Sequence, residues 1–283
     1  MAKKERSNGK AAELLEQIDN SLDQLADALD RGESEQLAAF LKYLSRFHRY
    51  SFGNVMLIAL QRPDATHVAG FRTWKQLGRH VKKGERGIAI LAPIVRKVNQ
   101  AKDADEEEPE KPKRRAVGYR AVHVFDVSQT AGDSLPQFAR VAGEPGDYSR
   151  RIRSNIVAAG IELKTECIPG GAHGVSRGRE IAVRPELNPA VEFSVLAHEY
   201  AHELLHRGER RNETTKTIRE TEAEAVAYVV SNAIGLDAGT ASSDYIKLYD
   251  GSRNTLQESL KHIRECAAKI LGELLDDGAF GSS

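Results

Sequence analysis

The chain has 283 residues, of which 40% are hydrophobic and 29% are charged. This composition is typical of a soluble globular protein, and the length allows two domains. The 41 Lys and Arg residues balance 41 Asp and Glu residues, so the overall charge gives no reason to expect a polyanionic partner. No stretch approaches the roughly 18 uninterrupted apolar residues that cross a membrane, and the first residues are charged. We therefore expect a cytoplasmic protein with no membrane partner.

The first half of the chain has the pattern of helices followed by a small antiparallel sheet. Apolar residues recur at helical spacing in four segments, residues 10–30, 34–44, 54–60 and 71–77. Strand-forming residues follow at 87–94 and 117–127. Between these strands, residues 99–115 are charge-dense and contain two prolines, which predicts a mobile hairpin tip.

Residues 42–96 carry a local excess of positive charge. They include eleven Lys and Arg residues against only Asp64 and Glu85, with aromatic residues between the cations. This combination suits single-stranded DNA, because bases stack on aromatic faces while a basic groove follows the phosphates. The candidate DNA-binding residues are Arg46, Arg49, Tyr50, Asn54, Trp74, Arg79, Lys82 and Lys83. The alternative is that the aromatic residues belong to the core and the cations only solvate the surface.

The second half follows residues 133–147, which are rich in Gly, Pro and polar residues and are expected to link two domains. The expected strands and helices lie at residues 148–159, 161–164, 179–184, 189–206, 214–234 and 252–276. We therefore predict an α+β protein, with a helical and antiparallel-sheet domain at residues 1–132 and a second domain at residues 148–283.

His198, Glu199 and His202 form an H-E-x-x-H pattern within an apolar helix. Two histidines four residues apart project from one helix face, so both imidazoles can bind one zinc ion beside the intervening glutamate. The alternative is a pair of surface histidines, but apolar neighbours argue against it, because burying unpartnered imidazoles is costly. The pattern predicts Zn²⁺ as cofactor, His198 and His202 as ligands and Glu199 as the catalytic base.

A catalytic zinc ion usually takes a third protein ligand, and the next helix offers three glutamates. Glu220 and Glu224 are one turn apart and share a face. A pair of this kind resembles the one in Glu-type zincins, and that resemblance implies Glu220 as the ligand and Glu224 as the acceptor of a ligand histidine's other N–H. Glu222 points elsewhere and is interpreted as part of a solvated face, although it remains the alternative ligand. His206 is interpreted as a helix cap or surface residue.

The H-E-x-x-H motif and the acidic segment at residues 220–225 together resemble the ImmA/IrrE-type metallopeptidases, over about residues 150–235. The resemblance implies a zincin-like domain, in which a small sheet packs on the active-site helices. It also implies that the strand at residues 178–184 is an edge strand that aligns an extended protein or peptide substrate.

The first half carries a second resemblance, through the run Tyr50-Ser51-Phe52-Gly53-Asn54, the pair Phe71 and Trp74, and the segment at residues 81–88. Over about residues 10–127 the chain resembles the amino-terminal domain of ArdC-type antirestriction proteins. That resemblance implies binding of single-stranded DNA, a zincin-like domain after it, and a role in protecting incoming DNA from restriction. The acidic motif departs from the ArdC pattern toward the ImmA/IrrE type.

The sequence therefore predicts a zinc metallopeptidase with an amino-terminal domain that binds single-stranded DNA. Its protein substrate is not identified by the sequence. The alternative function is a DNA-binding antirestriction protein with a structural zinc ion and no peptidase activity.

Overall fold

The computed structural model describes residues 2–97, 114–133, 144–168, 172–236 and 252–275. The chain divides into two compact units, one of Met1–Asn20 and Met56–Asp133, the other of Ser21–Val55 and Ser134–Ser283. Helices and small sheets occur in the same chain, which confirms the predicted α+β class. Contacts assign residues 21–55 to the unit that holds the second half of the chain, whereas the predicted domain limits, 1–132 and 148–283, group them with the first. Those limits stay a prediction.

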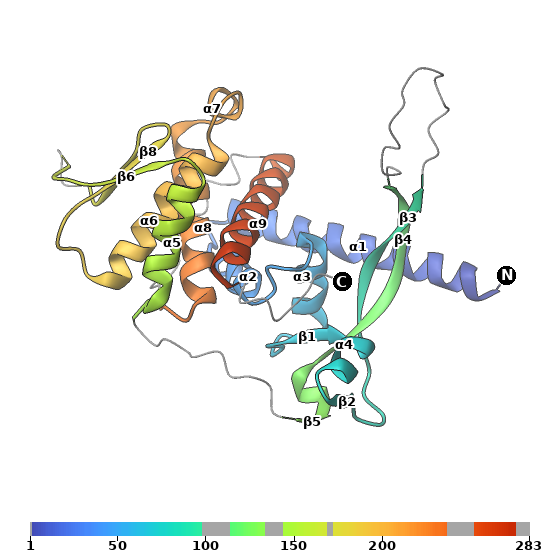
Figure 1. Ribbon diagram of the computed structural model, residues 1–283. Helices are drawn as coiled ribbons and strands as arrows, with labels where there is room; N and C mark the ends of the chain where they lie inside the picture. The colour runs from blue at the N-terminus through green and yellow to red at the C-terminus, as the bar shows by residue number, and fades with distance from the viewer. Residues whose placement is uncertain (1, 98–113, 134–143, 169–171, 237–251, 276–283) are drawn as a thin grey trace, which may run out of the picture. The chain divides into compact units, whose positions relative to one another are not determined.

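The first unit contains a three-stranded antiparallel sheet in the order β1-β4-β3 and a two-stranded sheet of β2 and β5. Figure 1 shows β3 and β4 as a long twisted ribbon. The elements of the first unit are part of α1 (Ala2–Asp30), most of α3 (Phe52–Gln61), β1 (Val68–Gly70), α4 (Phe71–Gln76), β2 (Arg79–Val81), β3 (Ile88–Lys97), β4 (Arg114–Asp126), η1 (Val127–Gln129) and β5 (Thr130–Gly132). The predicted helices and antiparallel sheet are thus confirmed, and the predicted tip between β3 and β4 lies largely outside the described residues.

The second unit is built mainly from helices. Besides the rest of α1 and α3, its elements are α2 (Glu35–Arg46), α5 (Asp147–Ala158), β6 (Glu162–Thr165), β7 (Gly174–Ser176), β8 (Glu180–Val183), α6 (Pro189–Leu205), α7 (Arg210–Glu213), α8 (Lys216–Ala233) and α9 (Arg253–Leu275). Helix α8 packs against α2, α6 and α9, and α5 packs against α6 and α9 (Figure 1). None of the helices in the described ranges combines the length and apolar character needed to cross a bilayer.

The small sheet of this unit has the order β6-β8-β7, with β6 parallel and β7 antiparallel to β8. Strand β8 is therefore central, and Ile181, Ala182 and Val183 are completely buried. The prediction that residues 178–184 form an edge strand is wrong, because hydrogen-bonded neighbours cover both sides of β8. In this sheet β7 lies at an edge, and it packs against α6.

Local capping determines where the two long helices of the site begin. Helix α6 starts with Pro189 after Asn188, whose side-chain oxygen accepts the Ala190 N–H at 2.9 Å. Helix α8 starts after Thr215, whose hydroxyl accepts the Ile218 N–H at 3.2 Å. The two helices that start in this way pack against each other.

Candidate metal centre

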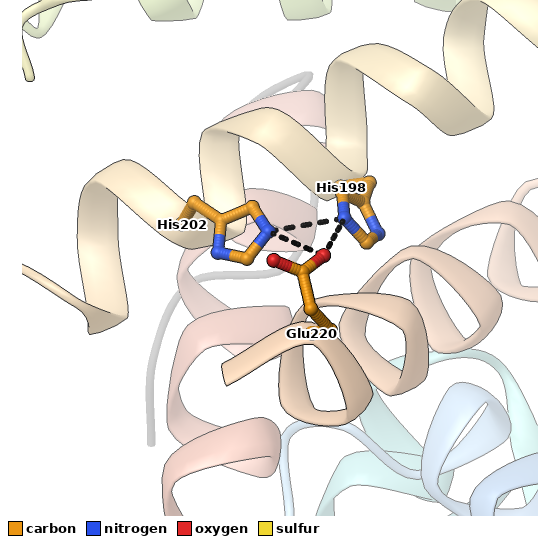
Figure 2. A group of neighbouring side chains, drawn as sticks. All are labelled: His198, His202 and Glu220. Atoms are coloured by element: carbon orange, nitrogen blue, oxygen red, sulfur yellow. Dashed lines mark hydrogen bonds and ion pairs between the residues drawn. The ribbon is translucent and has the colours of Figure 1, made fainter. Parts of the chain in front are cut away.

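His198 and His202 of α6 and Glu220 of α8 point toward one another (Figure 2). The Nε2 atoms of the two histidines are 3.1 Å apart. A carboxylate oxygen of Glu220 lies 3.6 Å from Nε2 of His198 and 3.5 Å from Nε2 of His202. The structure thus brings together the three residues that the sequence predicts as ligands.

These separations fit a small tetrahedral cation. Ligand atoms placed about 2.05 Å from a tetrahedral zinc ion lie about 3.3 Å from each other, and the three measured separations fall on both sides of that value. Two imidazoles and a carboxylate are also a donor set that zinc accepts, with a fourth position left for water. The cluster can therefore hold one divalent ion.

The charge states of the cluster suit metal binding. The pKa of Glu220 is lowered to about 2, mainly by its hydrogen bond with His198. The pKa of His202 is lowered to about 4, mainly by burial. At neutral pH the carboxylate is ionised and the imidazole of His202 is neutral. These are the protonation states in which both groups can coordinate a metal.

Glu199 is buried against strand β7, with 7% of the residue exposed. Burial raises the pKa of its carboxyl group, against the opposing effects of His198 and of a hydrogen bond from the Ser176 backbone N–H. The strand comes this close because residue 174 is glycine. A Cβ at Gly174 would lie 2.5 Å from a side-chain carbon of Val195 and 2.9 Å from Cγ of Glu199.

Glu203, one turn after Glu199, holds the turn between β7 and β8. Its carboxylate accepts the Ser176 hydroxyl at 2.5 Å and the backbone N–H groups of Gly178 and Arg179 at 3.0 and 2.9 Å. Gly178 and Arg179 both have positive φ, which is strained for arginine. The carboxylate therefore stabilises an unfavourable backbone turn next to the site.

The side chains of Glu222 and His206 are both buried. Glu222 is completely buried, and it accepts hydrogen bonds from Arg210 at 2.6 and 2.8 Å and contacts Nε2 of His206 at 2.9 Å. The interpretation as a solvated residue is wrong, because α7 and α9 cover this side of α8. His206 caps α6 as predicted, since its N–H donates to the His202 carbonyl, but its side chain is buried rather than at the surface.

Glu224 is half-buried on α8. The nitrogen of His202 that faces away from the cluster, Nδ1, contacts Nδ1 of His206 at 3.1 Å. His206 is therefore the residue beside the outer nitrogen of His202, whereas the sequence prediction placed Glu224 beside one of the two ligand histidines. A role of Glu224 beside His198 stays a prediction.

The eight candidate DNA-binding residues differ in exposure. Trp74 is 2% exposed, and its Nε1–H donates to the Phe125 carbonyl at 2.9 Å. Asn54 is buried as well. Trp74 is therefore a core residue, as in the alternative interpretation, and the prediction that it stacks on bases is wrong for this conformation, because both faces of its indole are covered.

The cations of that set lie in two places. Arg46, Arg49, Lys82 and Lys83 are exposed, whereas Arg79 is half-buried and donates to Thr130 at 2.8 Å. The second unit holds Arg46, Arg49, Tyr50 and Asn54, whereas the first unit holds Trp74, Arg79, Lys82 and Lys83. A single groove formed by all eight stays a prediction.

Fold and site together define a class: an α+β protein in which an H-E-x-x-H helix and a glutamate of the next long helix form a candidate metal centre. Residues 10–125 match the family model of the N-terminal domain of anti-restriction factor ArdC. The predicted resemblance to ArdC is therefore confirmed for the first half of the chain. The resemblance of residues 150–235 to the ImmA/IrrE type stays a prediction.

One relative is an uncharacterised protein of Bacillus anthracis, which is 24% identical in a match that covers 85% of this chain. The chain spans about half the length of this curated relative, since the match covers 48% of it.

Two similar solved structures are of the antirestriction ArdC protein from the R388 plasmid. The Mn(II)-bound structure has a TM-score of 0.50 at 16% identity and covers 92% of this chain and 98% of that one. The metal-free structure has a TM-score of 0.48 at 18% identity and covers 80% and 86%. The Mn(II)-bound structure shows that the two proteins share a fold.

Proposed function

We propose that this protein is a metal-dependent peptidase, in which His198, His202 and Glu220 hold one divalent ion and Glu199 moves the protons of hydrolysis. The observation that carries the proposal is the convergence of the three ligand atoms within 4.8 Å of one another. Zinc is the ion that two imidazoles and a carboxylate favour. The Mn(II)-bound ArdC structure, which has the same fold, supports a divalent ion more generally.

When bound, such an ion supplies a Lewis acid that activates water at neutral pH. Glu199 is the group that takes a proton from that water at its carboxylate and returns it to the leaving amine. Burial raises the pKa of Glu199 toward neutrality, which makes the carboxylate a stronger base. The backbone N–H of Ser176 donates a hydrogen bond that holds the Glu199 carboxylate in place.

The proposed substrate is an extended peptide. In the described sheet, β7 pairs with β8 on one side only, and it runs beside Glu199. A peptide that added to this free edge by backbone hydrogen bonds would pass the cluster. This arrangement supports cleavage of an unfolded or exposed segment of a protein.

The match of residues 10–125 to the ArdC N-terminal domain supports a second part of the proposal, that the chain binds single-stranded DNA and acts in antirestriction. The alternative function uses the same match: a DNA-binding antirestriction protein in which the metal ion only stabilises the fold. The two functions differ in whether Glu199 is needed.

The test replaces Glu199 with glutamine, which keeps the shape of the side chain but accepts no proton. Hydrolysis of an unfolded protein such as casein, measured with zinc and with or without single-stranded DNA, should fall about 10²- to 10⁴-fold. Zinc content should not change. The control is Glu213→Gln, at an exposed glutamate of α7, which should behave as wild type. Wild-type protein that holds zinc and hydrolyses nothing would favour the alternative.

A further inference from the structure

A line of buried polar side chains leads away from the candidate metal cluster within the second unit. Nδ1 of His202 lies 3.1 Å from Nδ1 of His206, and Nε2 of His206 lies 2.9 Å from Glu222. The side chains of His206 and Glu222 are 1% and 0% exposed. Arg210 completes the line with two hydrogen bonds to Glu222.

The direction of these hydrogen bonds follows from the pair formed by Arg210 and Glu222. Arg210 only donates, and the ionised carboxylate of Glu222 only accepts. Both oxygens of the Glu222 carboxylate accept from the Arg210 guanidinium, at 2.6 and 2.8 Å, and a carboxylate paired with arginine in this way is ionised. Nε2 of His206 must therefore carry the hydrogen in its contact with Glu222.

The charge balance then determines the other nitrogen of His206. Arg210 already neutralises Glu222, and a second buried positive charge beside that pair would be unbalanced. His206 is therefore neutral, and its Nδ1 carries a lone pair. Since Nδ1 of His202 is at hydrogen-bond distance from that lone pair, Nδ1 of His202 must be the donor.

We propose that His206 is a positioning residue: together with Glu222 and Arg210 it holds His202 in the Nδ1–H tautomer, with the lone pair of Nε2 facing His198 and Glu220. In the opposite tautomer, a hydrogen on Nε2 of His202 would point into the cluster and exclude a metal ion. His206 thereby also sets the ring orientation of a ligand, as outer partners of metal-binding histidines do. This role rests on the metal site proposed above.

The first test reads the tautomers in the metal-free full-length protein, by nitrogen-15 NMR of the histidine rings. Nδ1 should carry the hydrogen in His202 and Nε2 should carry it in His206. The reverse order in either ring would overturn the proposal. No metal is present in this experiment, so its result does not depend on whether the wild-type protein binds zinc. Zinc binding by the wild-type protein tests the proposed function separately.

The second test measures zinc affinity by competition with a chelator. His206→Phe keeps a ring but has neither donor nor acceptor, and should bind zinc about 10- to 100-fold more weakly. His206→Gln offers an acceptor oxygen and a donor amide, and should recover most of the affinity. The control is Tyr200→Phe, which removes another buried link of α6, the hydrogen bond to Glu273 at 3.2 Å.

Tyr200→Phe should lower the thermal midpoint of the metal-free protein and leave zinc affinity as in wild type. If His206→Phe does the same, His206 only ties two helices together and the proposal is wrong. If His206→Phe does not fold, the NMR measurement on the wild-type protein still decides the tautomer.

Discussion

Gly174 is the residue that allows strand β7 to lie against Glu199. A Cβ at this position would approach Cγ1 of Val195 to 2.5 Å and Oε1 of Glu199 to 3.0 Å. Carbon atoms of neighbouring side chains pack at about 3.5–4.0 Å. Any other residue at position 174 must displace the strand, the Val195 side chain or the Glu199 side chain.

We therefore expect Gly174→Ala to destabilise the protein by about 1–3 kcal/mol, the usual cost of overpacking. A shift of Glu199 by about 1 Å would also lower hydrolysis by up to about 10²-fold. Denaturant unfolding and the casein assay measure the two effects. Gly272→Ala is the matched control, because nothing lies within 4 Å of a Cβ there and alanine favours the α9 helix. A Gly174→Ala protein as stable as wild type would show that β7 does not lie against α6.

Helix spacing predicted that His198 and His202 share one face and that Glu220 and Glu224 share another, and the resemblance to Glu-type zincins then selected Glu220 as the third ligand. The sequence could not predict the burial of His206 and Glu222. Periodicity tells which side of a helix a residue occupies, but not that α7 and α9 cover that side. Trp74 was misjudged for a similar reason, since composition does not distinguish an aromatic residue that stacks on bases from one that fills the core.

At the scale of elements, Glu203 joins helix α6 to the β7–β8 turn. One carboxylate oxygen accepts from Ser176 and Gly178, and the other accepts from Arg179 and pairs with Arg207 at 2.7 Å. A glutamine has one oxygen and one NH₂ group. Two of the four donors around Glu203 would therefore face this NH₂ group instead of an acceptor. Glu203→Gln should therefore destabilise the protein by about 1–3 kcal/mol.

The same carboxylate gives a pH signature. Burial by itself raises the pKa of Glu203, but the hydrogen bonds from Ser176, Arg179 and Gly178 and the charge of Arg207 lower it below the ordinary value of 4.5. Its contribution to stability is therefore complete above about pH 4.5 and is lost as the pH falls through the lowered folded value. Glu203→Gln should reduce this loss between neutral and acid pH, measured as the free energy of unfolding.

The control is Asp147→Asn, which breaks an exposed pair with Arg150 and should change stability by less than about 1 kcal/mol. If Glu203→Gln has no more effect than Asp147→Asn at neutral pH, the turn does not depend on this carboxylate.

The long elements could be predicted from the sequence, whereas the short ones could not. Helices such as α6 and α8 repeat their apolar pattern over several turns. Strands β1, β2, β5 and β7 have three residues each, too few for an alternating pattern to stand out. Missing β7 is also why β8 was assigned to an edge, since the edge strand that pairs with it was not recognised.

At the scale of the whole molecule, the positive excess of residues 42–96 predicts salt-dependent binding of single-stranded DNA. Each neutralised phosphate should contribute roughly 0.7 to the slope of log affinity against log salt. Lys82 and Lys83 are both exposed, so replacing both with alanine should flatten the slope by about 1.4 in a fluorescence titration. The titration uses the full chain, because residues 1–132 do not coincide with one compact unit.

The matched control replaces Lys261 and Lys269 of α9, which are also exposed, and changes the net charge equally. It should leave the slope unchanged. Equal effects from both double variants would mean that DNA binding depends only on the overall charge of the protein. If the chain binds no single-stranded DNA, the cations of residues 42–96 only solvate the surface.

The ligand assignment predicts an order of effects within α8. Glu220→Ala should nearly abolish metal retention, because it removes a ligand. Glu224→Ala should weaken retention by about 10- to 100-fold if Glu224 supports a ligand from outside. An equilibrium zinc titration measures both losses. A larger loss from Glu224→Ala than from Glu220→Ala would show that the ligand has been assigned to the wrong turn of α8.

The central claim is that one divalent ion binds between α6 and α8, and the most direct test is the metal content of the purified protein. Elemental analysis after equilibration with zinc and removal of free metal should find one ion per chain in wild type. The double variant His198→Ala/His202→Ala should hold none, because a single carboxylate retains zinc weakly. One zinc ion per chain in that double variant would contradict the account.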